Sequence, residues 1–425
     1  MLRVNVTPEL LEVTLSARAA FSKRSWPFVT AMAVPWLLCA GQRSIRRMAQ
    51  MGGLRRSASA YYRFLSEGKL RPAILFRCLF KLIVDTFHIQ NLTLVLDDTL
   101  CPKWGKKIYG TSSYFDHVRR PRPGYIWGHN WVVLCAVVGM AKNRSIALPF
   151  WIGLYQRKED CAAGQFYTRH EMAAGALSLV RALFSGPIRL LADGAYATDS
   201  LIGRIRHWNV ELVSRLRSDA ALRAPTPPRR SQGSRGRKAK HGAPLGKLEH
   251  LARSRTAFRE QKVWIYGKSV ALQVREFQAY WPALGQVIKV VITRDPKRPK
   301  RVAYLFSTDC KLTSVELIEA FAKRWTIEQL FSVAKNQMGL DSAEVRKQKS
   351  VVRHATLCMA LITWTEVWAH RVHPRSWGQP FTQKLASLRA ETVTETIFAS
   401  GPRDKGSRRN ARDIGTLFTS ATSAA

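Results

Sequence analysis

The sequence predicts an α/β protein with a central sheet and a buried helix in its second half. Two apolar runs, residues 91–96 and 188–192, have the pattern of buried strands, and an aspartate follows each directly. The stretch Thr313–Gly339 carries helix signals at both ends and apolar residues nearly all round. With 46% hydrophobic and 10% aromatic residues, the 425-residue chain is predicted to be globular and to hold two or three domains.

The charge of the chain indicates its partner. Lys and Arg number 68 against 29 Asp and Glu, which gives a net charge of +39. Such an excess repels itself unless it meets a polyanion, so nucleic acid is the expected partner and an anionic membrane the alternative. The longest apolar runs, Ala31–Ala40 and Trp131–Met140, are about half the ~20 residues of a membrane span. We therefore expect no membrane partner.

The cysteines and the N-terminus predict a cytoplasmic protein. The seven cysteines are scattered singly without a CxxC motif, which is typical of reduced thiols and not of structural zinc. The N-terminus lacks the compact apolar run and cleavage site of a signal peptide.

Residues 1–88 have a helical pattern rich in Arg and Lys. Two short amphipathic runs, Ser44–Gln50 and Ser59–Ser66, are separated by Gly52-Gly53. They fit a helix-turn-helix, although many helical hairpins share this pattern. We predict a helical DNA-binding region in which three arginines approach the DNA backbone: Arg55, Arg56 and Arg63.

The next elements bring two aspartates to strand ends. Residues 91–100 run into Asp97-Asp98-Thr99, and residues 188–192 run into Asp193-Gly194. Carboxylates at the carboxyl ends of strands lie where α/β sheets place their chemistry. The loop after the first strand carries Lys103, Lys106 and Lys107, which fit either a solvated loop or a phosphate contact. Further strands are expected at Trp131–Met140, Ser145–Tyr155 and Val210–Leu216, and helices at Phe166–Phe184 and Asp199–His207.

The composition changes at Arg223–Lys247, which has eight Arg and Lys and no acid. This composition predicts a basic loop that contacts DNA. Strand patterns follow at Lys262–Trp281 and Gln286–Asp295, which together indicate a β-rich insertion. A strand at Val302–Ser307 leads into the helix Thr313–Gly339, and an apolar helix is expected at Val351–His370. Residues 373–425 are predicted to be a loosely ordered, basic tail.

The helix Thr313–Gly339 carries the third acid. Thr313 and Glu316 have capping-box spacing, and Gly339 is placed for a left-handed stop. At 100° per residue, four side chains fall within about 60° of one another: Phe321, Arg324, Glu328 and Lys335. An ordinary ion pair between Arg324 and Glu328 on a half-exposed face is the alternative interpretation.

Asp97, Asp193 and Glu328 form a minimal set for phosphodiester chemistry. Two Mg²⁺ ions about 4 Å apart can activate a nucleophile and stabilise the leaving oxygen. Mg²⁺ binds through one or two carboxylates together with water and phosphate oxygens. No GxSxG, HExxH, Walker or GxGxxG motif offers a competing chemistry.

These residues resemble a known family. The spacing Phe321-x2-Arg324-x3-Glu328-x6-Lys335 is similar to the Tyr-Arg-Glu-Lys signature of the DDE transposases of bacterial cut-and-paste insertion sequences, with Phe in place of Tyr. The segment from Asp97 to Lys106, with Pro102-Lys103-x-Gly105-Lys106, is similar to the first-acid region of one branch, and Asp193-Gly194 to the second-acid position. The resemblance spans about 90–340.

The resemblance implies an RNase H-like catalytic core. Its two parts would be residues 89–222 and 303–372, separated by the basic loop and β-rich insertion at 223–302 and followed by the tail at 373–425. The core would act as a homodimer on transposon ends and target DNA in the bacterial nucleoid.

The resemblance also implies roles for particular residues. Asp97, Asp193 and Glu328 would be catalytic and would bind Mg²⁺, for which Mn²⁺ is expected to substitute. The DNA contacts would come from Arg324, Lys335, Tyr304, Lys103 and Lys106. Tyr304 would stack on a flipped base, with ordinary core packing as the alternative.

The predicted function is a transposase that binds the terminal inverted repeats of its own element, cleaves DNA and transfers strands. Two alternatives remain open from the sequence. One is a catalytically idle, transposase-derived DNA-binding regulator, and the other is a plain RNase H-like nuclease.

Overall fold

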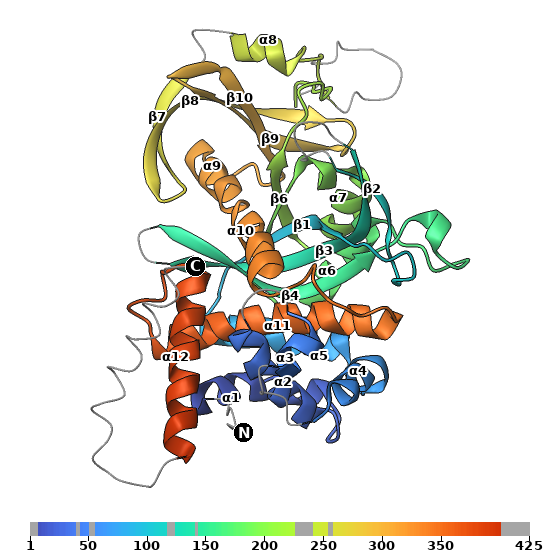
Figure 1. Ribbon diagram of the computed structural model, residues 1–425. Helices are drawn as coiled ribbons and strands as arrows, with labels where there is room; N and C mark the ends of the chain where they lie inside the picture. The colour runs from blue at the N-terminus through green and yellow to red at the C-terminus, as the bar shows by residue number, and fades with distance from the viewer. Residues whose placement is uncertain are drawn as a thin grey trace.

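A ten-stranded mixed sheet forms the centre of the computed structural model, which describes residues 7–39, 43–50, 56–116, 124–140, 143–225, 241–253 and 258–400 (Figure 1). The strand order is β2-β3-β1-β5-β6-β10-β9-β8-β7, and β4 pairs with β3 off this path. The strands are β1 (Leu92–Pro102), β2 (Ser112–Asp116), β3 (Gly124–Met140), β4 (Arg144–Tyr155), β5 (Ile188–Ala192), β6 (Val210–Arg215), β7 (Arg259–Ile265), β8 (Lys268–Trp281), β9 (Gln286–Asp295) and β10 (Arg298–Ser307).

Parallel and antiparallel pairing meet at β1. This strand is antiparallel to β3 and parallel to β5, and β5 is in turn parallel to β6. The parallel register runs from Leu92 opposite Ile188 to Leu96 opposite Ala192 and ends there. The mixed α/β sheet is consistent with the RNase H-like core expected from the sequence.

β1 is longer than predicted. The sequence suggested a strand that stops at the aspartates, but β1 continues to Pro102 because β3 pairs with it as far as Gly128. Asp97 therefore lies where the parallel neighbour stops and not where the strand itself stops.

The segment between β6 and β10 extends the same sheet. β10 pairs antiparallel with β6, and β9, β8 and β7 follow in antiparallel order. The strand patterns at Lys262–Trp281 and Gln286–Asp295 are confirmed as strands, with a turn at Tyr266-Gly267 in which both residues have positive φ. The basic loop at Arg223–Lys247 falls mostly on residues 226–240, outside the described residues.

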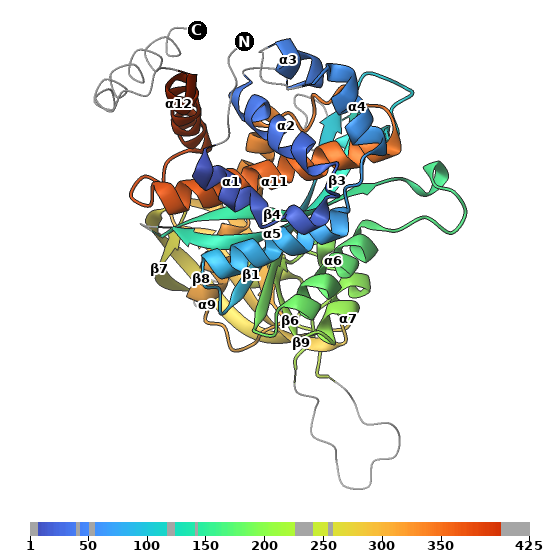
Figure 2. The ribbon, with the colours of Figure 1, turned by 90° about the horizontal axis from the view of Figure 1, so that it is seen from below.

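Helices cover both faces of the sheet. α6 (Arg169–Leu183) and α7 (Asp199–Arg206) lie on one face, whereas α9 (Ser314–Lys323), α10 (Thr326–Ser332) and α11 (Gln348–Val372) lie on the other (Figures 1 and 2). The remaining helices are α1 (Pro8–Leu15), α2 (Trp26–Leu38), α3 (Ile45–Gln50), α4 (Ala58–Glu67), α5 (Pro72–Thr86), α8 (Leu248–Arg253) and α12 (Phe381–Ser400). Short 3₁₀ turns lie at Arg18–Ala20, Lys158–Asp160 and Gly194–Tyr196.

The N-terminal helices pack against the core. The indole of Trp36 in α2 donates to the carbonyl of Met338 at 2.9 Å, and Arg353 in α11 donates to the carbonyl of Leu65 in α4 at 2.7 Å. Figure 1 shows these helices together with α11 on the same side of the sheet. The two runs of the proposed helix-turn-helix are confirmed as the helices α3 and α4.

The three arginines of that motif have different surroundings. Arg55 lies outside the described residues, Arg56 stacks over the ring of Phe28, and Arg63 is exposed. Binding of DNA by residues 1–88 stays a prediction.

The prediction of a loosely ordered tail is wrong for residues 381–400. Residues 381–400 form α12, whose apolar Phe381, Leu385 and Leu388 are buried at helical spacing. Arg389 of α12 also donates to the carbonyl of Leu37 at 2.9 Å. The helix was not predicted because the average hydrophobicity of the tail is low and only one stripe of the helix is apolar.

No helix in the described part of the chain is long and apolar enough to cross a membrane. None of the seven cysteines forms a disulfide bond, in agreement with the reduced thiols expected from their spacing.

Candidate active site

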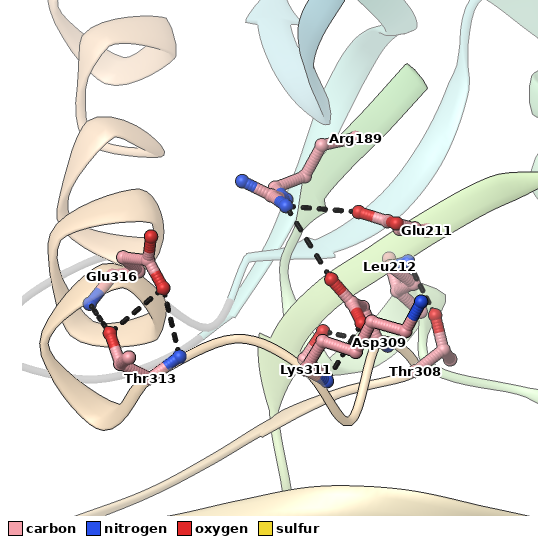
Figure 3. A network of polar contacts seen from close by, with 9 residues as sticks. Arg189, Glu211, Leu212, Thr308, Asp309, Lys311, Thr313 and Glu316 are labelled. Carbon is pink, nitrogen blue, oxygen red and sulfur yellow. Dashed lines mark hydrogen bonds and ion pairs between the residues drawn. The ribbon is translucent and has the colours of Figure 1, made fainter. Parts of the chain in front are cut away.

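The start of α9, the helix before the one that carries the third acid, is fixed by a polar network (Figure 3). Thr313 and Glu316 form the predicted capping box, in which each side chain bonds the backbone N–H of the other. Arg189 of β5 contacts both Glu211 of β6 and Asp309 in the loop before α9. These contacts tie the entry of α9 to the parallel part of the sheet.

The predicted single helix over Thr313–Gly339 is divided into three parts. α9 ends at Lys323, α10 begins at Thr326, and a π-helical turn runs from Val333 to Gln337 before Gly339, which has the expected positive φ of 70°. The backbone N–H groups of Arg324 and Trp325 bond carbonyls three residues back instead of four. Tight and wide turns of this kind interrupt a uniform 100° stripe, and π turns are frequent at functional sites.

Arg324 at this break joins the sheet to the helix. Its Nη1 lies 3.0 Å from Oδ2 of Asp97 on β1, and its Nη2 lies 2.6 Å from Oε1 of Glu328 on α10. The side chains of Arg324 and Asp97 are only 16% and 19% exposed, and that of Glu328 is 34% exposed. The structure thus brings Asp97, Arg324 and Glu328 together, as the sequence predicted.

Asp193 lies beside Asp97 through strand register. Leu96 is opposite Ala192, so Asp97 and Asp193 occupy the next positions of the parallel pair. The charge of Asp193 acts on Asp97 and contributes to raising its pKa. The three predicted acids therefore gather on the α10 side of the sheet.

Phe321, which stands where the resemblance expects a tyrosine, contacts two arginines. The guanidinium carbons of Arg215 and Arg324 lie 5.9 and 5.8 Å from its ring centroid. Rings at this distance attract cations through their quadrupole. Phe321 therefore helps to hold Arg324 without a hydroxyl.

Asp98 points to the opposite face of β1 and has its own partners. Its Oδ2 accepts from Nη1 of Arg169 at 2.9 Å, and its Oδ1 accepts from the hydroxyl of Tyr196 at 3.0 Å. Tyr196 is 2% exposed and belongs to the turn that directly follows Asp193.

The same turn is held from α6 as well. His170 Nε2 lies 3.0 Å from the carbonyl of Ala195. The contacts of Tyr196 and His170 were not predicted from the sequence. Two signals for them were present: Tyr196 lies close after Asp193, and His170 lies near the start of the helix expected at Phe166–Phe184.

The electrostatics of Asp97 are dominated by burial. The pKa of Asp97 is raised to about 7, with burial as the largest cause. The charges of Asp98 and Asp193 also act to raise it, whereas the backbone N–H of Asp98 and the charge of Arg324 act to lower it. Desolvation thus outweighs the ion pair with Arg324. A cation bound close to Asp97 would stabilise the ionised form of its carboxyl group.

The acids do not form a closed metal cage. Within the described residues, no three His, Cys, Asp or Glu side chains stand close enough together to hold a metal ion. The guanidinium of Arg324 lies between Asp97 and Glu328 and keeps these two carboxylates apart.

The predicted basic contacts differ in exposure. Lys335 is half-buried in the π turn. Burial raises the pKa of the Cys101 thiol on β1, and the nearby charge of Lys335 offsets part of that rise. Lys106 is exposed. Lys103 is 7% exposed and donates to the carbonyl of Asp341 at 2.6 Å, so it fastens the chain after the π turn to β1 and is not placed to contact DNA.

Tyr304 lies on the face of the sheet opposite to α9. Leu305 of β10 is opposite Arg215 of β6, whose guanidinium lies over Phe321 of α9. Since neighbouring residues of a strand point to opposite faces, Tyr304 points away from α9. The charges of Glu249 and Arg253 on α8 act on its half-buried phenol, whose pKa is raised by burial. This position favours the core-packing alternative for Tyr304.

Two cavities lie near the acids but do not contain them. Cavities of about 410 and 360 Å³ lie along α10, where Thr326 and Gln329 line both. Neither is lined by Asp97, Asp193 or Glu328.

Two models of known protein families match the chain. Residues 18–267 match the family model described as DDE superfamily endonuclease, and this match contains Asp97 and Asp193. Residues 273–364 match the model described as Archaeal putative transposase ISC1217, and this match contains Glu328. No curated protein matches the chain significantly.

Proposed function

Since the chain belongs to the DDE superfamily endonucleases, we propose that it is a transposase that binds the terminal inverted repeats of its own insertion sequence. It then cleaves DNA strands at these ends and transfers them to a target. The observation that carries this proposal is the meeting of Asp97, Asp193, Arg324 and Glu328 from two strands and a helix on one face of the sheet.

Divalent metal ions are the general cofactors of DDE endonucleases, and we propose Mg²⁺ here, with Mn²⁺ as a substitute. The donor set fits: Asp97 and Asp193 are adjacent in register, and burial raises the pKa of Asp97 to about 7. Mg²⁺ needs only one or two carboxylates together with water and phosphate oxygens, so a closed cage of three acids is not required. Asp97 and Asp193 would hold the ion, with Glu328 beside it.

The metal, when bound, supplies Lewis-acid stabilisation of charge on the phosphate and lowers the pKa of bound water. The protein supplies the rest through position and charge. Arg324, whose two nitrogens already lie within 3.0 Å of carboxylates, has the bidentate geometry that also suits a phosphate. The half-buried Lys335 and the exposed Lys106 would provide further point charges for the DNA backbone.

The test separates DNA binding from cleavage. Asp97→Ala, Asp193→Ala and Glu328→Ala should each abolish nicking of end DNA in Mg²⁺, because each removes a metal-binding or adjacent acid. Gel-shift affinity should stay within a few-fold of wild type, because phosphate contacts elsewhere carry most of the binding. Full nicking by any of these variants would remove that residue from the proposed catalytic set.

A charge-matched control uses Glu260, an exposed carboxylate on β7. Glu260→Ala changes the net charge of the protein by the same amount as the three variants, so it should bind and nick as wild type does. If Glu260→Ala also lost nicking, the losses in the other variants would reflect charge in general and not the proposed site.

One observation favours a second candidate, an idle DNA-binding protein. Arg324 forms ion pairs with both Asp97 and Glu328, and the described residues hold no cluster of three metal ligands. Wild-type protein that binds end DNA but neither nicks it nor joins it in Mg²⁺ or Mn²⁺ would support this candidate. Nicking without strand joining would instead identify a plain nuclease.

We also propose that the protein acts as a homodimer on paired ends. Sedimentation of the metal-free complex should then give two chains and two end duplexes for each particle. A stable complex of one chain with one duplex that completes strand transfer would contradict this part of the proposal.

A further inference from the structure

The antiparallel ribbon of β2 and the start of β3 lies at the edge of the sheet (Figure 1). Aromatic side chains are exposed on this ribbon. Phe115, Tyr125 and Trp127 are 42%, 70% and 40% exposed. Large apolar groups gathered at one exposed place commonly mark an interaction surface.

The three rings share one face of the ribbon. Phe115 is opposite Tyr125, and Ser113 is opposite Trp127, in the antiparallel register. Residues opposite or two apart in such a pair lie on the same face. The rings of Phe115 and Tyr125 are 5.4 Å apart in an edge-to-face arrangement. We refer to Phe115, Tyr125 and Trp127 as the aromatic face.

The loop after β1 adds a fourth ring and positive charge. The indole of Trp127 lies 3.4 Å from the carbonyl of Gly105, its acceptor, so this loop borders the aromatic face. Trp104 in the same loop is 98% exposed, and Lys106 and Lys107 are exposed beside it.

Further cations lie on the next segment. The backbone N–H of Tyr109 donates to the carbonyl of Arg346 at 2.9 Å, which places Arg346–Lys349 along the same loop. Three cations of this segment are exposed: Arg346, Lys347 and Lys349. By strand alternation, the acid at the end of β2, Asp116, points to the face opposite the rings.

The aromatic face lies on the same side of the sheet as the proposed active site. Asp97 is opposite Val133, and Cys101 is opposite His129. Trp127 is an even number of residues from Val133 along β3, so it points to the side of Asp97. Six residues of strand at about 3.3 Å each place Trp127 roughly 20 Å from Asp97, and the other two rings lie farther along the ribbon.

We propose that the aromatic face binds unpaired bases of a DNA strand that continues from the proposed active site. Exposed rings next to lysines are the combination by which proteins bind single-stranded DNA, because bases stack on the rings while cations follow the backbone. A protein partner is less suited, since lysines are depleted in protein interfaces. This inference rests on the proposed function, because the active site supplies the strand.

The test measures binding without cleavage. Fluorescence anisotropy in EDTA compares a blunt end duplex with the same duplex carrying roughly six unpaired thymidines, which span about 20 Å at 3.4 Å per nucleotide. Wild type should bind the extended duplex more tightly than the blunt one. Tyr125→Ala should lose about 5- to 150-fold of that preference, which corresponds to the stacking of one base at 1.4 kcal/mol per tenfold.

Matched variants keep the test specific. Tyr125→Phe preserves the ring and should preserve the preference, whereas Trp104→Ala, at a 98% exposed position where folding is not at risk, should reduce it. Equal loss of blunt-duplex binding in Tyr125→Ala would overturn the proposal in favour of duplex contact. An unchanged preference in both alanine variants, or a changed oligomeric state in sedimentation, would overturn it as well.

The outcome can be separated from that of the proposed function by wild-type nicking in Mg²⁺. A protein that nicks but shows no preference for the extended duplex contradicts only the aromatic-face proposal. A preference without nicking contradicts only the proposed catalytic activity.

Discussion

Replacing Tyr196 by phenylalanine tests whether the turn after Asp193 is held in place from β1. The substitution keeps the buried ring and removes only the hydroxyl, which donates to Oδ1 of Asp98 at 3.0 Å. Asp98 is 17% exposed in its side chain and retains Arg169 on its other oxygen. A hydrogen bond to a charged group contributes about 1.5–3 kcal/mol, so we expect the free energy of unfolding to fall by about that amount.

The expected functional effect follows from where the bond lies. Tyr196 belongs to the turn that begins after Asp193, and Asp98 directly follows Asp97. The bond therefore sets the position of one proposed metal ligand relative to the other. A displacement of about 1 Å can cost about 10²-fold in rate, so Tyr196→Phe should slow nicking strongly while end binding stays within a few-fold.

Two assays separate positioning from stability. Urea unfolding followed by tryptophan fluorescence gives the change in free energy. Single-turnover nicking of labelled end DNA over a range of Mg²⁺ concentrations gives the half-saturating concentration. Because the displaced ligands would bind the ion less well, that concentration should rise in Tyr196→Phe, whereas a loss of stability alone would leave it unchanged below the unfolding midpoint.

Tyr114→Phe is the matched control. Tyr114 is 7% exposed, and its hydroxyl donates to the neutral carbonyl of Tyr155 at 2.9 Å. Its loss should cost about 0.5–1.5 kcal/mol without changing nicking or the Mg²⁺ dependence. If Tyr196→Phe nicked like wild type at the same Mg²⁺ concentrations, the positioning role would be refuted.

Two further predictions concern buried charges. Because burial raises the pKa of Asp97 from 3.8 to about 7, its folded state holds a proton that the unfolded state has lost, and stability should decrease as pH rises from about 4 to 7. Unfolding in EDTA across this range should show a fall of at most about 4 kcal/mol at 1.36 kcal/mol per pH unit, and an equal fall in Asp97→Asn would contradict the assignment. Lys384 contacts Glu366 at 2.6 Å with both side chains under 5% exposed, so Glu366→Leu should cost about 3–5 kcal/mol by leaving the ammonium unpaired. Glu366→Leu with Lys384→Met should restore most of that loss in urea unfolding, and a double variant as unstable as the single one would argue against the pair as the cause.

Strands were predictable wherever both faces are buried. Residues 188–192 and 286–295 were expected as strands and are strands at those bounds. The capping box at Thr313 and the left-handed Gly339 were also predictable, because each depends on neighbouring residues only. Local signals of this kind need no knowledge of distant partners.

The partners of buried polar groups could not be predicted in the same way. Lys103 was expected to contact DNA, but its ammonium bonds a carbonyl 238 residues away. The Tyr196–Asp98 bond spans 98 residues. Contacts over such separations depend on how the strands and helices pack, and a single sequence gives no measure of that packing. For the same reason Tyr304 could be placed on a strand but not on a face.

Arg324 connects the predictable and unpredictable parts of the site. Its i, i+4 spacing from Glu328 indicates an ordinary helix pair, which contributes about 0.3–0.5 kcal/mol on an exposed surface. The fold adds Asp97 from 227 residues away and leaves the guanidinium only 16% exposed, so the contact joins the helix to the sheet. When ionised, the three carboxylates and this one guanidinium leave two negative charges, which one divalent cation would balance. A cation held by Asp97 and Asp193 would weaken the pull of Asp97 on Arg324 and leave that nitrogen to bond a DNA phosphate. Under the proposed function, the contact that keeps a cage of three acids from closing would thus also place a cation beside them that can bind phosphate.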